Sequence, residues 1–268
     1  MSKLRLAVSA VSFLVVLAVV PGFAQTPPSS ASPQTPSAAS DENKTLPDEE
    51  LARLYMLRKQ YREAQEIFHR LTVEHPKNAQ YWNELGITYH NQQELGAALK
   101  CYEKSVKLDK EYADPQNNIG TIYYERKKYP KAIRAYKRAI AVKGDSAVFY
   151  LNLGYAYFAD KQSDQFVAAL RQALQLDPKV LEAGRSRAGS IVQDRSVAED
   201  RARFDFLWAK TLAEAGDLEH CIVYLKKARD EGYKDLNSVN TDPSFAKVVN
   251  EPAIQEILAP KPSDTVRQ

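Results

Sequence analysis

The 268-residue sequence predicts an all-α protein, built as a helix-turn-helix solenoid of four regular repeats, a degenerate fifth repeat and a C-terminal helical cap. Three observations predict this fold. Four segments align without a gap at a period of 34 residues, and small residues return in fixed columns of that alignment. Within each segment, apolar residues recur at spacings of three and four, as in amphipathic helices. Such units stack on their neighbours to bury a continuous core, and they typically bind other molecules.

The chain before the repeats is expected to lie outside the solenoid. Residues 1–24 have the pattern of a signal peptide, with two basic residues, an apolar run of about 15 residues and small residues before a cut after Ala24. The protein is therefore expected to be exported, either to the periplasm or out of the cell. An uncleaved membrane anchor is the alternative, although a spanning helix needs about 20 apolar residues. Residues 25–46 are rich in Pro, Ser, Thr, Ala and Gln, which predicts a disordered linker.

Residues 47–180 hold the four regular repeats, each expected to form two helices, A and B. On helix A, small residues fill the column of Ala52, Gly86, Gly120 and Gly154. Gly inside a helix costs about 1 kcal/mol relative to Ala, so we expect helix B to cross closely at this column. The facing column on helix B holds Ala64, Ala98, Ala132 and Phe166. The larger Phe166 predicts wider packing in the fourth repeat.

These columns resemble the tetratricopeptide repeat, whose pattern runs W-x2-L-G-x2-Y, then A-x3-F, then P. The second repeat matches it at Trp82, Leu85, Gly86, Tyr89, Ala98 and Tyr102. The third matches at Ile119, Gly120, Tyr123, Ala132, Tyr136 and Ala139, and the fourth at Tyr150, Leu153, Gly154, Tyr157, Ala173 and Pro178. The resemblance covers residues 45–178. It implies a right-handed superhelix whose A helices line a concave groove that binds a protein or peptide.

The repeat register is lost after residue 180, across an insertion assigned to residues 181–201. Residues 202–235 fit the template again and are interpreted as the degenerate fifth repeat, through Trp208, Ala209, Leu212, Gly216, Cys221, Leu225 and Ala228. The sequence of residues 236–260 predicts two short helices, each beginning at a proline. They are expected to cap the apolar face that the solenoid would otherwise expose at its C-terminal end. Residues 261–268 are expected to be a disordered tail.

No motif in the sequence indicates catalysis, a metal or a cofactor, so we expect a non-enzymatic protein without either kind of ligand. The histidines have no partner at a metal-ligand spacing. His220 and Cys221 are adjacent, but neighbouring side chains on a helix point about 100° apart, so Cys221 is interpreted as a packing residue. Cys101 and Cys221 lie several repeats apart and are expected to be free, mostly buried thiols.

The overall charge gives no support for binding to nucleic acid. Loss of Lys3 and Arg5 with the signal peptide lowers the formal net charge from +3 to +1. Non-specific nucleic-acid binding needs clustered basic charge. After cleavage the chain is also expected to have no stable membrane insertion, which leaves a protein or peptide as the expected partner.

The candidate binding site is the groove lined by the A helices. Its expected inward positions are polar with aromatic patches, and they are Asn83, Glu84, Ile87, His90, Asn117, Asn118, Thr121, Tyr124, Asn152, Tyr155 and Phe158. Asn118 and Asn152 share a repeat column, and carboxamides both donate and accept hydrogen bonds. This pair resembles two rungs of the asparagine ladder in O-linked N-acetylglucosamine transferases, which implies a grip on a peptide backbone. Asparagines that merely cap or solvate helices are the alternative.

The groove positions do not favour a carboxylate ligand. Co-chaperones of the tetratricopeptide repeat family hold a C-terminal carboxylate with Lys and Arg, whereas the corresponding positions here are Glu49, Arg53, Glu84, Asp114 and Asn118. Acidic side chains repel a carboxylate, so we expect no clamp of that kind.

Three functions are compatible with the sequence. The favoured hypothesis is an exported module that grips an extended protein segment in the concave groove. The first alternative is an envelope-assembly scaffold that acts through its convex face or residues 181–201. The second is an enzyme or sugar-binding protein with a site near the insertion, using acids such as Asp194, Glu199 or Asp200.

Overall fold

The computed structural model describes residues 46–180 and 198–259. The predictions for the signal peptide, the tail, nearly all of the linker and residues 181–197 of the insertion lie outside these ranges. All regular secondary structure in the described residues is helical, which confirms the predicted all-α class. Across the same residues, none of the helices is both long enough and apolar enough to cross a membrane.

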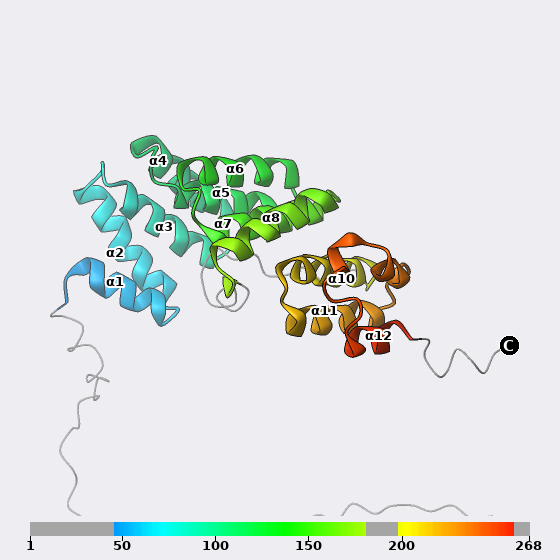
Figure 1. Cartoon of the computed structure of the whole chain (residues 1–268). Helices are drawn as coiled ribbons and strands as arrows, with labels where there is room; N and C mark the ends of the chain where they lie inside the picture. Colours follow the sequence, from blue (N-terminus) through cyan, green and yellow to red (C-terminus); the bar gives the residue numbers. More distant parts are fainter. Residues whose placement is uncertain (1–45, 181–197, 260–268) are drawn as a thin grey trace, which may run out of the picture. The chain divides into compact units, whose positions relative to one another are not determined.

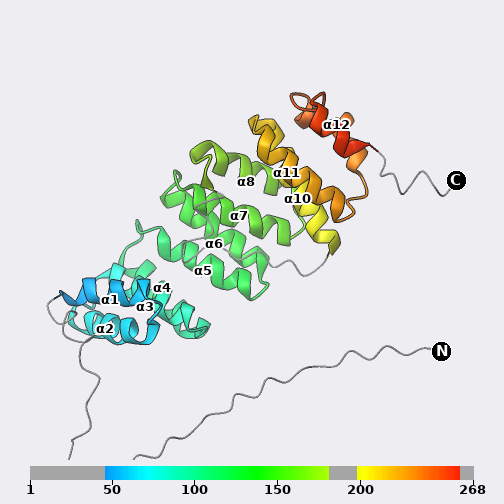
Figure 2. The same cartoon turned by 90° about the horizontal axis from the view of Figure 1, so that it is seen from below.

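The four regular repeats are four pairs of helices, shown in Figures 1 and 2. The pairs are α1 (Asp48–Leu57) with α2 (Tyr61–Glu74), α3 (Ala79–Asn91) with α4 (Leu95–Leu108), α5 (Asp114–Glu125) with α6 (Tyr129–Val142), and α7 (Ala147–Ala159) with α8 (Ser163–Leu176). The two helices of each pair pack together, and helix B of one repeat also packs on helix A of the next. This arrangement is the predicted helical solenoid.

The turn between helices A and B has the same backbone geometry in every repeat. One residue of each turn has a left-handed φ between 56° and 64°, and these residues are Lys59, Gln93, Lys127 and Lys161. The backbone N–H of the residue that follows then donates to the carbonyl five residues earlier. In the third repeat, for example, the N–H of Lys128 donates to the Tyr123 carbonyl at 2.8 Å. This bond closes the end of helix A, as in a Schellman motif.

Residues 198–259, which we call the C-terminal unit, repeat this turn between α10 (Ala198–Ala215) and α11 (Leu218–Asp230). Gly216 takes the left-handed position with a φ of 81°, and the N–H of Asp217 donates to the Leu212 carbonyl at 3.0 Å. Glycine adopts this backbone conformation without strain. Helix α10 begins inside the range assigned from sequence to the insertion, so that predicted boundary is corrected. The charged start of α10 hides its helical period.

Helices A and B cross at the predicted glycine column. A Cβ atom at Gly86 would lie 2.5 Å from the Tyr102 ring, and one at Gly120 would lie 2.5 Å from the Tyr136 ring. Both tyrosine rings are buried, so neither can move aside. At Gly154 the nearest atom is a Leu170 methyl at 3.4 Å, an ordinary contact. The fourth repeat is therefore more loosely packed at this crossing, as its sequence predicts.

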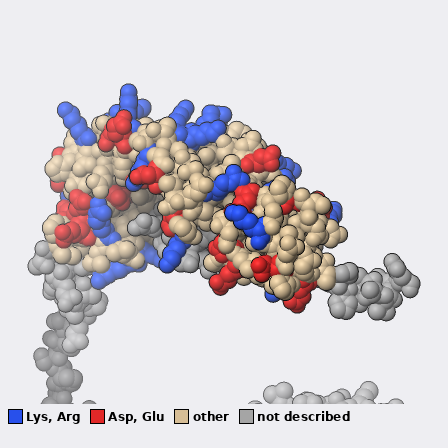
Figure 3. Space-filling view, viewed as in Figure 1, with Lys and Arg blue, Asp and Glu red and all other residues tan. Residues whose placement is uncertain are grey.

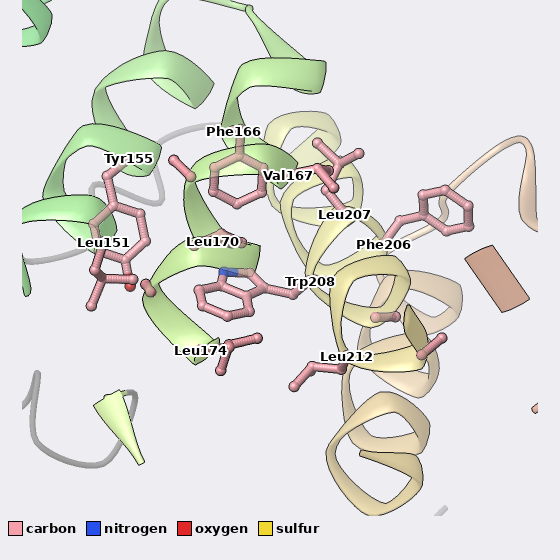
Figure 4. Close-up of a cluster of buried hydrophobic side chains, with 14 of the residues drawn as sticks. Leu151, Tyr155, Phe166, Val167, Leu170, Leu174, Phe206, Leu207, Trp208 and Leu212 are labelled. Atoms are coloured by element: carbon pink, nitrogen blue, oxygen red, sulfur yellow. The ribbon is translucent and has the colours of Figure 1, made fainter. Parts of the chain in front are cut away.

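Phe166 connects the fourth repeat to the C-terminal unit. Its ring lies edge-on to Trp208 of α10 (Figure 4), with 6.2 Å between centroids. The same ring contacts Phe204 and Phe158, with 5.6 and 5.4 Å between centroids. The rings of Phe166 and Trp208 are fully buried. The large side chain in a small-residue column thus fills the interface between α8 and α10.

The C-terminal cap covers the outer side of α10 and α11. It consists of η2 (Leu236–Asn240), η3 (Pro243–Phe245) and α12 (Pro252–Leu258). The last two are the predicted elements that begin at a proline. Phe245, Ile254 and Ile257 are fully buried, and they belong to a core that extends from α6 to α12.

We expect Gly120→Ala to destabilise the protein by about 1–3 kcal/mol, because the added methyl overpacks the crossing with Tyr136. Gly154→Ala is the matched control. It is expected to be neutral or to stabilise by up to about 1 kcal/mol, because Ala favours the helix and the methyl has room. Urea unfolding followed by circular dichroism measures both. Equal effects at the two positions would contradict the crossing geometry.

Candidate functional site

The predicted site residues lie on α3, α5 and α7, on one side that we call the A-helix face. Contacts between successive helices show that these positions are adjacent. For example, His90 Nε2 on α3 lies 2.9 Å from the Glu125 carboxylate on α5. The corresponding side of α1 contributes Glu49, whose carboxylate pairs with Arg53 at 3.0 Å and accepts from the Tyr81 hydroxyl at 3.0 Å.

The asparagines of the A-helix face are buried and hydrogen-bonded to one another. Asn118 Nδ2 donates to Asn83 Oδ1 at 3.0 Å, and Asn152 Nδ2 donates to Asn117 Oδ1 at 2.9 Å. Asn83 Nδ2 in turn donates to the Tyr112 hydroxyl at 3.0 Å. The four side chains are at most 8% exposed. These bonds join α3 to α5 and α5 to α7.

This arrangement corrects the prediction of an exposed ladder. Each amide pairs with the asparagine one column earlier in the preceding repeat, instead of facing a ligand along a single column. The alternative of capping or solvating asparagines is corrected as well. A buried amide that loses its partner costs about 1–3 kcal/mol, so these residues hold neighbouring repeats together.

Two further predicted site residues also contribute to packing. Thr121 is buried, donates to the Asn117 carbonyl at 3.3 Å and accepts from the Tyr136 hydroxyl at 3.2 Å. Tyr155 is 8% exposed and stacks on Phe204 with 5.9 Å between centroids. Neither presents an open side chain to a ligand.

The remaining five predicted residues are partly exposed, and they are Glu84, Ile87, His90, Tyr124 and Phe158. Ile87 packs against the buried core beside it, and Phe158 meets Phe204 edge-on at 5.1 Å. Tyr124 lies against Tyr129 at 5.4 Å. The accessible part of the face is thus acidic at α3 and aromatic at α5 and α7.

Glu84 is the unusual charge on this face. Burial raises the pKa of its carboxyl, Arg53 opposes that rise, and Asp114 and Glu49 add to it. Among the described residues Glu84 has no ion pair or hydrogen bond. The side chain of Arg53 is already paired with Glu49. The repeat pattern places Glu84 on the face, but only the structure shows that its carboxylate has no partner among the described residues.

The cysteines are packing residues, as predicted. Both thiols are free and buried. Burial raises the pKa of Cys101 to about 11 and that of Cys221 to about 12, so both stay protonated near neutral pH. His220 instead lies 2.8 Å from the Asp217 carboxylate on the surface. Within residues 46–180 and 198–259 no three His, Cys, Asp or Glu side chains are grouped to hold a metal.

Comparison with protein families agrees with this architecture. The family described as TPR repeat matches residues 88–125 and 120–161, and two families described as tetratricopeptide repeat match residues 147–180 and 50–78. The chain is a tetratricopeptide repeat protein. The matches fall on the four helix pairs from α1 to α8.

Several solved structures resemble the chain at low sequence identity. PilF of Pseudomonas aeruginosa is 18% identical, with 82% of this chain and 99% of PilF covered and a TM-score of 0.51. TTC0263 of Thermus thermophilus is 18% identical, with 75% and 97% covered and a TM-score of 0.48. MamA of Desulfovibrio magneticus RS-1 is 17% identical, with 72% and 97% covered and a TM-score of 0.48. No curated protein sequence matches this tetratricopeptide repeat protein.

We expect Glu84→Gln to raise the melting temperature by about 2 °C near pH 7. The pKa of Glu84 in the folded protein lies above its unfolded value of about 4.5. Ionisation of Glu84 therefore lowers the free energy of unfolding as the pH rises from the unfolded pKa to the folded pKa. The difference from the native protein should therefore shrink toward about pH 4. Glu50→Gln, at the same repeat position on α1 but exposed, is the control. A gain from Glu84→Gln that does not depend on pH would contradict this assignment.

Proposed function

We propose that this tetratricopeptide repeat protein is a non-enzymatic module that binds an extended segment of a partner protein along the A-helix face. The half-buried carboxylate of Glu84, without an ion pair in the described residues, is the observation that supports this best. A buried charge is costly unless it is paired, and a Lys or Arg of the partner would supply the pair.

The surroundings of Glu84 favour a basic and aromatic or aliphatic ligand. Asp114 and Glu49 add negative charge near Glu84, and the partly exposed rings of Tyr124 and Phe158 follow on the next A helices. Tyrosine and phenylalanine rings contact both apolar side chains and cations favourably. The same acidic charge disfavours a C-terminal carboxylate, so a clamp of the co-chaperone kind is not part of the proposal.

Selection of random peptides displayed on phage tests the proposal. We expect the enriched peptides to combine Lys or Arg with an apolar side chain, and Glu84→Lys to weaken their binding at least tenfold through charge repulsion. Glu66→Lys, an equal charge change at an exposed position of α2, should leave binding unchanged. Melting curves establish that both variants fold.

Other outcomes would reject the proposal. Selected peptides that bind Glu84→Lys and the native protein equally would place binding away from the A-helix face. Failure to select any peptide would favour the alternative of an assembly scaffold.

We also propose that the protein is exported to the cell envelope, with residues 1–24 removed and residues 25–46 acting as a tether. The basic start, apolar run and small residues before Gln25 support this. Intact mass of the protein from its source cell should correspond to a chain that begins at Gln25. Replacing the small residue in Ala24→Tyr should block the cut, whereas Gln25→Asn should not. A native mass that includes Met1 would support the uncleaved anchor instead.

A further inference from the structure

A second surface on α4, α5 and α6 has the features of a binding site and contains none of the predicted site residues. It is a cavity of about 570 Å³. Its lining residues, which define the α4–α6 groove, are Glu103, Val106 and Lys107 from α4, Gln116, Ile119 and Tyr123 from α5, and Lys131, Arg134, Ala135 and Arg138 from α6. The groove therefore runs between two B helices, with the intervening A helix as its floor.

The floor of the groove is apolar. Ile119 and Ala135 are buried, and Val106 and Tyr123 are half-buried beside them. The one polar floor residue, Gln116, has a buried Oε1 with no hydrogen-bond donor among the described residues. An apolar side chain of a ligand could bury its surface here, and a backbone N–H entering with it is the type of donor that Gln116 lacks.

The rim of the groove is basic. Lys107, Lys131, Arg134 and Arg138 are exposed, and Glu103 is the single acid of the lining. In the part of the chain that the structure describes, none of these four cations forms an ion pair. Figure 3 shows Lys and Arg side chains gathered along the edge where α4 and α6 lie in Figure 1. The groove is thus a local excess of positive charge on a chain of nearly neutral total charge.

The repeat fold does not require these cations. The positions of Lys131 and Arg134 are occupied by Glu63 and Glu66 in the first repeat, and by Gln165 and Ala168 in the fourth. All of these sequences form the same helix B. Basic residues at these two positions are therefore not needed to form helix B, whereas the position of Arg138 is also basic in the first and second repeats, at Arg70 and Lys104.

We propose that the α4–α6 groove binds an acidic segment of a partner protein, with one apolar side chain in the cavity and carboxylates on the rim. Charge complementarity selects the acidic ligand. The apolar floor favours a peptide over a flat anionic membrane, which would meet the cations but leave the cavity unfilled. The cations on α6 span about 10 Å, or two helical turns, which matches a short peptide and is small for the phosphate backbone of a nucleic acid.

Fluorescence anisotropy with synthetic peptides tests this proposal on the purified protein. The probe carries one Leu flanked by Asp and Glu. One analogue replaces the acids with Asn and Gln, and the other replaces Leu with Ser. We expect each analogue to bind at least tenfold more weakly than the probe, and binding of the probe to weaken as salt concentration rises.

Two double variants with equal charge change locate the binding. Arg134→Glu with Arg138→Glu should lower affinity for the probe at least tenfold. Lys100→Glu with Lys137→Glu is the control, since Lys100 lies outside the lining and Lys137 points to the Tyr157 ring, 5.6 Å away. The affinity of the control variant for the probe should stay within twofold of that of the native protein. If melting curves show that the variant with Arg134→Glu and Arg138→Glu is unfolded, the variant with Arg134→Gln and Arg138→Gln is measured in its place.

Three outcomes would overturn the proposal. One is an equal loss of affinity for the probe in both double variants, which would indicate non-specific charge attraction. Another is full binding to Arg134→Glu with Arg138→Glu. The third is tight binding of phosphatidylglycerol vesicles or of a single-stranded oligonucleotide without binding of the acidic probe. Glu84→Lys should leave the probe's affinity unchanged, so this test is independent of the A-helix face.

Discussion

The close crossing of helices A and B at the glycine column is the constraint on which the rest of the structure depends. At Gly86 and Gly120 the tyrosine ring of helix B occupies the space that a Cβ atom would need. This contact sets how near the two helices of a repeat can lie. The left-handed turn after helix A then returns the chain at the distance that the crossing requires. With both features repeated every 34 residues, successive helix pairs present equivalent faces to their neighbours.

The fourth repeat shows how this constraint is relaxed. Leu170 replaces the tyrosine at the crossing, and Phe166 occupies the small-residue column. The freed space lets Phe166 meet Trp208 of α10, so the C-terminal unit packs on the array although its register is displaced. One large residue in a column of alanines therefore connects the regular repeats to the unit that follows them.

Two surfaces with opposite charge result from the same scaffold. Within the described residues, the Glu84 carboxylate on the A-helix face has no ion pair, and the cations of the α4–α6 groove have none either. Lys131 lies over the Tyr123 ring, 5.7 Å from its centroid. Under the two proposals, the protein would bind a basic segment on one side of the helix pairs and an acidic segment on the other. Such a division would suit a module that brings two partners together, which combines the binding and scaffold hypotheses.

The sequence by itself determined the helix pairs, the close crossings and the packing role of the cysteines, because these follow from residues that return in fixed columns of the repeat. The left-handed turns between helices A and B were decided by the structure, since lysine or glutamine occupies those positions in the four regular repeats. Only the tertiary structure decided the site. Asn118 bonds to Asn83, one column away from its repeat equivalent, so aligned columns alone suggested a ladder open to ligand. Likewise, Lys107 on α4 and Arg134 on α6 line the same cavity because the two B helices lie beside the same A helix. Side-chain direction and the packing between repeats fix these pairings, and a linear pattern of residues contains neither.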